Sequence, residues 1–516
     1  MKPAVFALCL LLLVGLCPVA AAGSVGYVPM DDRPVNLEYV LDTVRAAGVR
    51  MVTPSFSELA GRERVGSPER LWDWVFDQAP LNDAMALSSD SLIYGGLVPS
   101  RTHFFGEAEL AQRVERFREL KRRYPALRLY VFGTIMRTPT MSAGATEPPY
   151  YETVGPSIFR ITVLEDKREI SGLSGSEAAE LKVLLEKVPE QYLADWRTRR
   201  AKNHRVNEQL QELAREGLFE YLLLGRDDSS PLSASHQEFR YLEKKSADLS
   251  AARYLSIPGA DNLGMSMVVH AINDFEFRLP FVKVFYAPGA GGATIPSYED
   301  HLLAQTVPQH ITASGGLKLD LTEKPDLVLA VNTPASGLTR EANQAGNGTL
   351  PNPSVREFVR QVRTEMESGR SLAIADVSFA NGADNSLMAE LRKASLLHRP
   401  AAYSGGNTAG NTLGYAVGQG MLALYMNEKN RKKMLAIRYL DDWAYQANIR
   451  GELYDEIVYP NGNNGQYLNK LAPKLTQAAT RKIRRFATLN LWEIPEENIR
   501  VEFPWNRMFE ISIQVQ

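Results

Sequence analysis

Aspartates and arginines gather directly after short apolar segments of this chain. Asp31-Asp32-Arg33 follows the apolar segment 25–29, and Asp227-Asp228 follows the segment 221–224. Two carboxylates held close together suit general acid–base chemistry, because their repulsion keeps one protonated while the other is ionised. Glycoside hydrolysis uses such a pair. The candidate catalytic residues are Asp31, Asp32, Asp90, Asp227, Asp228 and Asp261.

A second set of polar residues could bind a substrate. Its arginines could hold anionic groups through paired hydrogen bonds, or could pair with the aspartates and order the site. The segment 404–414 combines glycines, which let a ligand approach the backbone, with amides and hydroxyls that bind hydroxyl groups. A tight strand-to-helix turn would explain the same segment. The candidate binding residues are Arg33, Asn36, Arg101, Arg137, Asn262, Asp384, Asn385, Asn407, Asn411 and Thr412.

Each of these residues also has a structural explanation, because Asp, Ser and Asn after a strand commonly cap the next helix. The string Gly-Ala-Asp-Asn occurs at 259–262 and again at 382–385, each time before a predicted helix. The two copies are either an internal repeat or a coincidence. Capping requires no arginine and only one carboxylate. The collective pattern therefore favours a ligand site.

The sequence favours neither a metal nor a cofactor. Clustered Asp, Asn and Ser could bind Ca²⁺ or Mg²⁺, but their spacing matches no EF-hand. The seven histidines form no H-x-H or H-E-x-x-H string. The glycine-rich segment 289–294 lacks the last glycine of G-x-G-x-x-G, and the chain contains no Walker A string and no G-x-S-x-G elbow.

Ten short apolar segments are predicted strands, and amphipathic stretches lie between many of them. This alternation predicts parallel sheets with helices packed outside. Ligands bind outside the carboxyl ends of such strands, which is where the candidate residues lie. The predicted strands are Val25–Pro29, Arg50–Thr53, Ala84–Leu87, Arg128–Phe132, Tyr221–Leu224, Ala252–Ile257, Val282–Tyr286, Asp326–Val331, Ser371–Ala375 and Ala401–Tyr403.

The predicted fold class is α/β, with a barrel-like or open N-terminal domain and a smaller doubly wound C-terminal domain. The first domain covers 23–290 and carries a helical insertion at about 140–218, which is either a solvated helical pair or a lid over the site. The second, flavodoxin-like domain covers 291–465. Residues 466–516 are predicted to form a helix and a strand pair that closes one sheet edge.

The first 22 residues have the pattern of a secretory signal, with Lys2, a short apolar run and an Ala20-x-Ala22 end. Cleavage after Ala22 would remove both cysteines of the chain, so disulfides and thiolate chemistry are excluded from the mature protein. We expect a periplasmic or extracellular protein. The net charge of −2 gives no reason to expect a nucleic-acid partner, and no later segment is apolar enough for stable membrane insertion.

Two strings carry a resemblance to a known family. Val28-Pro29-Met30-Asp31-Asp32-Arg33-Pro34-Val35-Asn36, together with Asn407-Thr408-Ala409-Gly410-Asn411-Thr412-Leu413-Gly414, resembles a bacterial family called domain of unknown function number 4127. The family has no established activity. The resemblance implies that Asp31, Asp32, Arg33 and Asn36 share a site with Asn407, Asn411 and Thr412.

The leading hypothesis is an exported hydrolase, most simply a glycosidase, that acts on a small-molecule or oligosaccharide substrate through carboxylate acid–base catalysis. The first alternative is a non-catalytic envelope protein that binds a sugar or a peptidoglycan fragment between two domains. The second is a metal-assisted ester or phosphoester hydrolase. A close pair of carboxylates in a deep cleft would favour the glycosidase. A cleft lined by amides and aromatic residues, without such a pair, would favour the binding protein. Three oxygen ligands converging on one point would favour the metal-assisted hydrolase.

Overall fold

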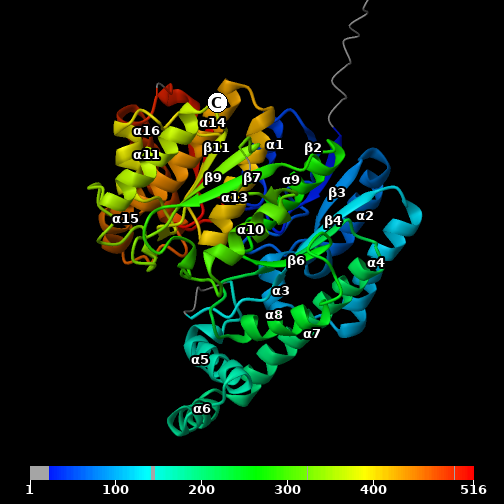
Figure 1. The fold of residues 1–516 in the computed structure, drawn as a ribbon. Coiled ribbons are helices and arrows are strands. Elements are labelled where there is room, and N and C mark those ends of the chain that lie inside the picture. Colours follow the sequence, from blue (N-terminus) through cyan, green and yellow to red (C-terminus); the bar gives the residue numbers. More distant parts are fainter. Residues whose placement is uncertain (1–22, 141–145, 322, 493) are drawn as a thin grey trace, which may run out of the picture.

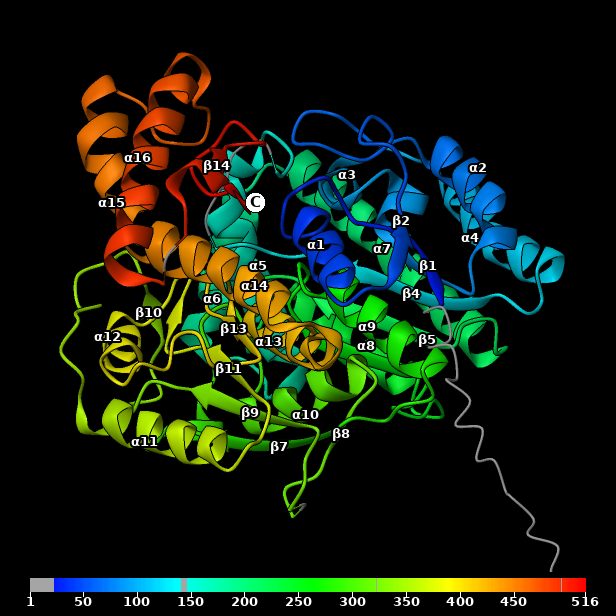
Figure 2. The same ribbon diagram turned by 90° about the horizontal axis from the view of Figure 1, so that it is seen from above.

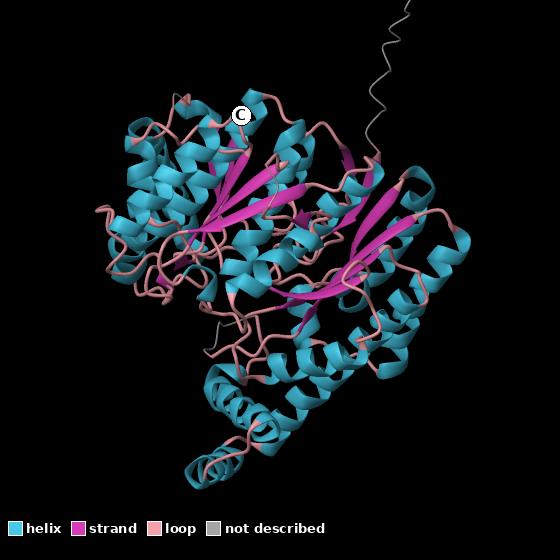
Figure 3. Ribbon diagram, viewed as in Figure 1, coloured by secondary structure: helices cyan, strands magenta, loops and turns pink. Residues whose placement is uncertain are grey.

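The computed structural model of the protein describes residues 23–140, 146–321, 323–492 and 494–516. The predicted signal, residues 1–22, lies outside the described residues. Two parallel sheets are flanked by helices and joined through a helical layer between them (Figures 1 and 3), which confirms the α/β class. None of the helices within the described ranges is long and apolar enough to cross a membrane.

The first sheet has six parallel strands in the order β2-β1-β3-β4-β5-β6. All residues of β3 and β5 are buried, as expected for strands that helices cover on both faces. Strands β2 and β6 each pair on one side only, so the described sheet is open. Its elements are β1 (Ser24–Val28), α1 (Glu38–Ala46), β2 (Arg50–Val52), α2 (Pro68–Gln78), β3 (Ala84–Ser88), α3 (Leu97–Thr102), α4 (Glu107–Arg123), β4 (Arg128–Ile135), β5 (Tyr221–Arg226), α8 (Ala234–Lys245), β6 (Tyr254–Pro258) and α9 (Leu263–Phe275).

Three helices occupy the long connection between β4 and β5. They are α5 (Tyr151–Ile170), α6 (Gly175–Lys187) and α7 (Glu190–Arg215). Figure 1 shows α5 and α6 projecting away from both sheets. Leu181 is the one buried residue of α6, so this helix is largely exposed to solvent, and the role of the insertion stays a prediction.

The second sheet has five parallel strands in the order β13-β11-β9-β7-β8. Counted along the chain from β7, this is the doubly wound order 2-1-3-4-5 of flavodoxin-like sheets, as predicted. A small parallel pair, β10 with β12, lies beside it. Its elements are β7 (Phe281–Tyr286), α10 (Leu303–Ala313), β8 (Leu317–Lys318), β9 (Leu327–Asn332), β10 (Arg340–Glu341), α11 (Pro353–Glu367), β11 (Leu372–Asp376), β12 (Phe379–Ala380), α12 (Asn385–Lys393), β13 (Ala402–Ser404) and α13 (Ala409–Leu422).

Helices α9 and α13 fill the space between the two sheets. Helix α9 packs on β3 and β4, α13 packs on β11 and β13, and the two helices contact each other. Both contribute to one apolar core that spans the two sheets, and Figure 2 shows them in the centre. The chain passes from the first sheet to the second between β6 and β7. The domain boundaries themselves stay predictions.

The C-terminal part begins with α14 (Glu428–Arg438) and a π-helical stretch, η5 (Tyr439–Ile449). Helices α15 (Arg450–Leu453) and α16 (Ala472–Asn490) follow. Strands β14 (Ile499–Glu502) and β15 (Ser512–Val515) then form an antiparallel pair. This pair is a separate sheet and does not extend the edge of a larger one. Its connecting loop, residues 503–511, reaches the candidate site.

Candidate functional site

A cavity of about 270 Å³ lies where the carboxyl ends of strands from both sheets meet. The loops after β1, β5 and β6 contribute Arg33, Asp228 and Asp261, and the loop after β13 contributes Asn407. The C-terminal hairpin closes it with Trp505, Arg507 and Phe509. The cavity therefore lies where ligands bind in doubly wound proteins.

Arg33 joins the loops after β1 and β6. Its Nε lies 3.0 and 3.1 Å from the two carboxylate oxygens of Asp31, and its Nη2 lies 2.7 Å from Asp261 Oδ1. Its guanidinium also lies 5.1 Å from the ring centre of Trp505. Asn36 donates to Asp31 at 2.7 Å. Asp31 and Asn36 thus hold Arg33 from behind, while Asp261 faces the cavity.

A second group of ion pairs lines the same cavity. Arg101 pairs with Asp227, Arg137 Nη1 donates to Asp228 at 2.7 Å, and both arginines contact Glu147. Burial alone would raise the pKa of the Glu147 carboxyl, but the charges of Arg137 and Arg101 outweigh burial and hold that pKa below its ordinary value. Glu147 thus anchors the two arginines that present Asp227 and Asp228.

Asp228 combines a raised pKa with partial exposure of its side chain. Burial and the neighbouring Asp227 charge raise the pKa of its carboxyl, against the opposing effect of Arg137 and Arg101. Its φ of +40° is unusual for a residue other than glycine, and such strain is often found at functional sites. Its side chain is 28% exposed, the largest exposure among the three cavity aspartates. A proton on Asp228 can therefore reach a ligand.

The loop after β13 is fixed to the loop after β6 by amides. Asn411 Oδ1 accepts hydrogen bonds from the backbone N–H groups of Ala260 at 3.0 Å and Asn262 at 3.2 Å. Asn407 Nδ2 donates to Asp261 at 3.0 Å, and Asn407 Oδ1 accepts from Asn411. These bonds position Asp261 between Arg33 and Asn407.

Two adjacent buried acidic residues, Glu299 and Asp300, hold the start of α13 and the end of β5. The Gly410 backbone N–H donates to Glu299, and burial raises the pKa of the Glu299 carboxyl to about 8. The next residue, Asp300, makes two hydrogen bonds of 2.8 and 3.0 Å with Arg226 at the end of β5. The segment 299–300 therefore connects the first sheet to the start of α13.

The structure separates the predicted catalytic residues into two groups. Asp227, Asp228 and Asp261 line the cavity. Asp31 lies behind Arg33, and Asp32 is held by Arg64 at 2.6 Å and by Trp505 Nε1 at 2.6 Å. Asp90 is buried beside Thr134, and burial raises the pKa of its carboxyl to about 7. The catalytic roles themselves stay predictions.

Five of the predicted binding residues line the cavity: Arg33, Arg101, Arg137, Asn407 and Asn411. The others support surrounding structure. Asn36 holds Asp31, Asn262 is fully buried against His310, and Thr412 Oγ1 bonds to the Asn407 carbonyl.

The second Gly-Ala-Asp-Asn string is built into the structure differently from the first. Asp384 caps α12 by accepting from the backbone N–H groups of Ser386 and Leu387. Asn385 bonds to Asn347, Trp443 and Asn448. Asp261 of the first string instead faces the cavity, so the structural explanation fits one string only.

Several cavity residues carried no usable sequence signal. Trp505, Arg507 and Phe509 belong to a hairpin recognised only by its alternating pattern, and Gln466 belongs to a loop far from the predicted strands. Tyr298 and Asn381 follow no predicted strand end directly. The φ values of +68° and +59° at Tyr298 and Asn381 are visible only in the fold.

The donor sets of the described ranges do not favour a metal. No group of three or more His, Cys, Asp or Glu side chains within them is arranged to hold an ion. The cavity aspartates instead each face an arginine at hydrogen-bond distance.

The comparisons with known proteins agree with the sequence resemblance. Residues 25–514 match the family described as Protein of unknown function (DUF4127). The searches of curated proteins and of solved structures found no match. Since the match covers nearly the whole described chain, the protein belongs to the DUF4127 family.

Proposed function

We propose that the protein is an exported hydrolase that cleaves a glycosidic bond in a carbohydrate or cell-wall-derived substrate. The observation that carries the proposal is the presence of two carboxylates in one cavity, Asp228 after β5 and Asp261 after the neighbouring strand β6. A glycosidase needs one carboxyl that donates a proton and one that accepts a proton or attacks.

Asp228 is assigned the role of general acid. Burial and Asp227 favour its protonated form, so it can protonate the glycosidic oxygen as the carbon–oxygen bond breaks. Asp261 is assigned the role of base or nucleophile, because Arg33 and Asn407 hold it in place at 2.7 and 3.0 Å. It either takes a proton from the attacking water or attacks the anomeric carbon itself.

The remaining lining suits a sugar. The amides of Asn381, Asn407 and Gln466 can both donate to and accept from hydroxyl groups. Phe509 offers aromatic surface to the cavity, whereas Trp505 is only 4% exposed and has Arg33 and Arg507 over its ring. The same amides and aromatics would support a binding protein without activity. The second carboxylate and the raised pKa of Asp228 favour the enzyme.

The test is a screen of residues 23–516 against aryl glycosides and peptidoglycan fragments, with Asp228→Asn, Asp261→Asn and the exposed control Asp73→Asn. We expect turnover by the wild-type protein and by the control. Asp261→Asn should lose about 10²–10⁴ in activity with every substrate, and Asp228→Asn should lose as much with the peptidoglycan fragments, whose leaving groups need protonation. Binding of a sugar without any turnover would support the binding protein instead. Full activity in both site variants would show that the carboxylates are assigned wrongly.

A further inference from the structure

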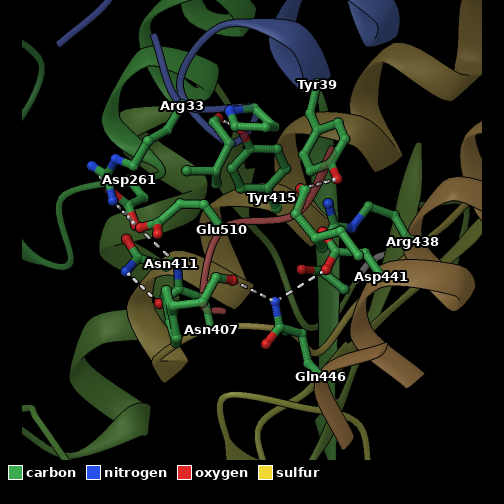
Figure 4. Close-up of a pocket in the computed structure, with 16 residues that line it drawn as sticks. Arg33, Tyr39, Asp261, Asn407, Asn411, Tyr415, Arg438, Asp441, Gln446 and Glu510 are labelled. Atoms are coloured by element: carbon green, nitrogen blue, oxygen red, sulfur yellow. Dashed lines mark hydrogen bonds and ion pairs between the residues drawn. The ribbon is translucent and has the colours of Figure 1, made fainter. Parts of the chain in front are cut away.

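A smaller inner pocket adjoins the proposed catalytic cavity, and Figure 4 shows the residues that line it, among them Asp441 and Gln446 of η5. The two share Arg33, Asp261, Asn407, Asn411 and Phe509 as lining residues. The inner pocket has a volume of about 50 Å³. A buried water needs roughly 10–15 Å³ by this measure, so three to four non-hydrogen atoms fit. The pocket has room for a substituent of a sugar, but not for a sugar ring.

Two buried polar atoms of residues that line this pocket have no hydrogen-bond partner within the described ranges. One is Arg438 Nη1, whose guanidinium otherwise pairs with Asp442. The other is Gln446 Oε1. Gln446 Nε2 donates to Asp441 and to the Phe509 carbonyl, both at 3.2 Å, which fixes the amide and leaves Oε1 as an acceptor. Arg438 and Gln446 are 7% and 5% exposed. Buried polar groups are normally satisfied, so this donor and this acceptor indicate a ligand.

The charges of the pocket disfavour an anionic ligand group. Its lining holds three carboxylates, those of Asp261, Asp441 and Glu510, against the two guanidiniums of Arg33 and Arg438. A carboxylate would also offer no hydrogen to Gln446 Oε1, and an ammonium would offer no acceptor to Arg438 Nη1. A neutral group with both a donor and an acceptor is required.

The remaining wall is apolar. Val35, Tyr39, Tyr415 and Ile511 contribute to it, and the ring of Tyr39 lies 4.9 Å from the Arg438 guanidinium. A hydroxymethyl group would supply a donor and an acceptor, but it has only two non-hydrogen atoms and no methyl group for this wall. An acetamido group has four non-hydrogen atoms, one acceptor, one donor and one methyl group.

We propose that the inner pocket binds the acetamido group of an N-acetylated amino sugar, so that the substrates are N-acetylhexosaminides. The carbonyl oxygen accepts from Arg438, the N–H donates to Gln446 Oε1, and the methyl group packs on Val35, Tyr415 and Ile511. This inference rests on the proposed function, since it assigns the substrate class of the same site.

The test is calorimetric titration of residues 23–516 with N-acetylglucosamine and N-acetylgalactosamine, each compared with its parent hexose. We expect at least one acetylated sugar to bind about tenfold or more tightly than its parent, since a polar site rejects a ligand that leaves its groups unpaired. Gln446→Met should abolish this preference and leave parent-hexose binding within about threefold. The control Ser378→Ala, in a separate cavity, should keep the preference.

A second variant guards against a folding defect in Gln446→Met. Val35→Leu narrows the pocket at its apolar wall, so it should weaken binding of the acetylated sugar about tenfold. Binding of the parent hexose should change little, and the circular dichroism spectrum of the variant should match that of wild type. Hexose binding or turnover without preference for the acetylated sugar overturns this inference and leaves the proposed function standing. Failure to bind or cleave any sugar overturns both.

Discussion

The buried carboxyl of Glu299 makes the stability of the protein depend on pH in a way that one substitution can remove. Its Oε1 accepts from the Gly410 N–H, while its Oε2 has no partner within the described ranges. Burial, with a smaller contribution from Asp300, raises the pKa of this carboxyl from 4.5 to about 8. Glu299→Gln keeps an acceptor for Gly410 and removes the titration.

The magnitude and sign follow from this pKa. A group whose pKa is higher in the folded state binds its proton more tightly there, so the folded state is favoured at low pH. The contribution is fully present below pH 4.5 and is lost as the pH rises to about 8. The rise of 8 − 4.5 = 3.5, at about 1.4 kcal/mol for each pKa unit, corresponds to a loss approaching about 5 kcal/mol.

The assay is urea unfolding of wild type and Glu299→Gln between about pH 4.5 and 9, with the exposed Glu276→Gln as the matched control. The difference in unfolding free energy, Glu299→Gln minus wild type, should increase by several kcal/mol as the pH rises. This difference should become constant above pH 8. Glu276→Gln should run parallel to wild type. If Glu299→Gln also ran parallel, the proposed protonation of this carboxyl would be refuted.

Three further substitutions test how the site is held together. Asn411→Leu removes the acceptor of two buried backbone N–H groups and should cost about 2–4 kcal/mol in urea unfolding. Arg33→Met leaves Asp31 and Asp261 without their cation and should cost about 3–5 kcal/mol near neutral pH, measured in the same way. Trp505→Phe keeps an aromatic ring but loses the bond to Asp32, and should lower the unfolding free energy by about 1–3 kcal/mol.

The expectation for Asn411→Leu has a matched control in the same loop. Thr412→Val loses only a 3.3 Å bond to the Asn407 carbonyl, so it should cost clearly less than Asn411→Leu. An equal cost for the two loop variants would contradict the hydrogen-bond assignments.

The fold was predictable where strands are buried on both faces. All ten apolar segments expected to be strands overlap an observed strand, because a short continuous apolar run is typical of a strand buried on both faces. The two-residue strands β8, β10 and β12 were not predicted, since two residues carry no periodicity. The open pairing of the first sheet depends on long-range register that local patterns do not encode.

The candidate site was predictable only where it follows strand ends. Asp228, Asp261 and Asn407 directly follow strands and line the cavity, as does Arg33 after β1. Asp31, Asp32 and Asp90 follow strands equally closely but lie behind the lining, because strand-end position does not determine which way a side chain points. Tertiary packing of the C-terminal part brings Trp505, Phe509 and Gln446 to the two pockets, and local sequence patterns do not predict that packing.

Asp228 is proposed to protonate the leaving group, and the most direct measurement of this role compares leaving groups. An alkyl glycoside needs protonation as its bond breaks, whereas an aryl glycoside with an acidic phenol needs much less. We predict that Asp228→Asn lowers kcat/KM about 10²–10⁴-fold for the alkyl substrate and far less for the aryl substrate. An equal loss for both substrates, or no loss for either, would contradict the role assigned to Asp228.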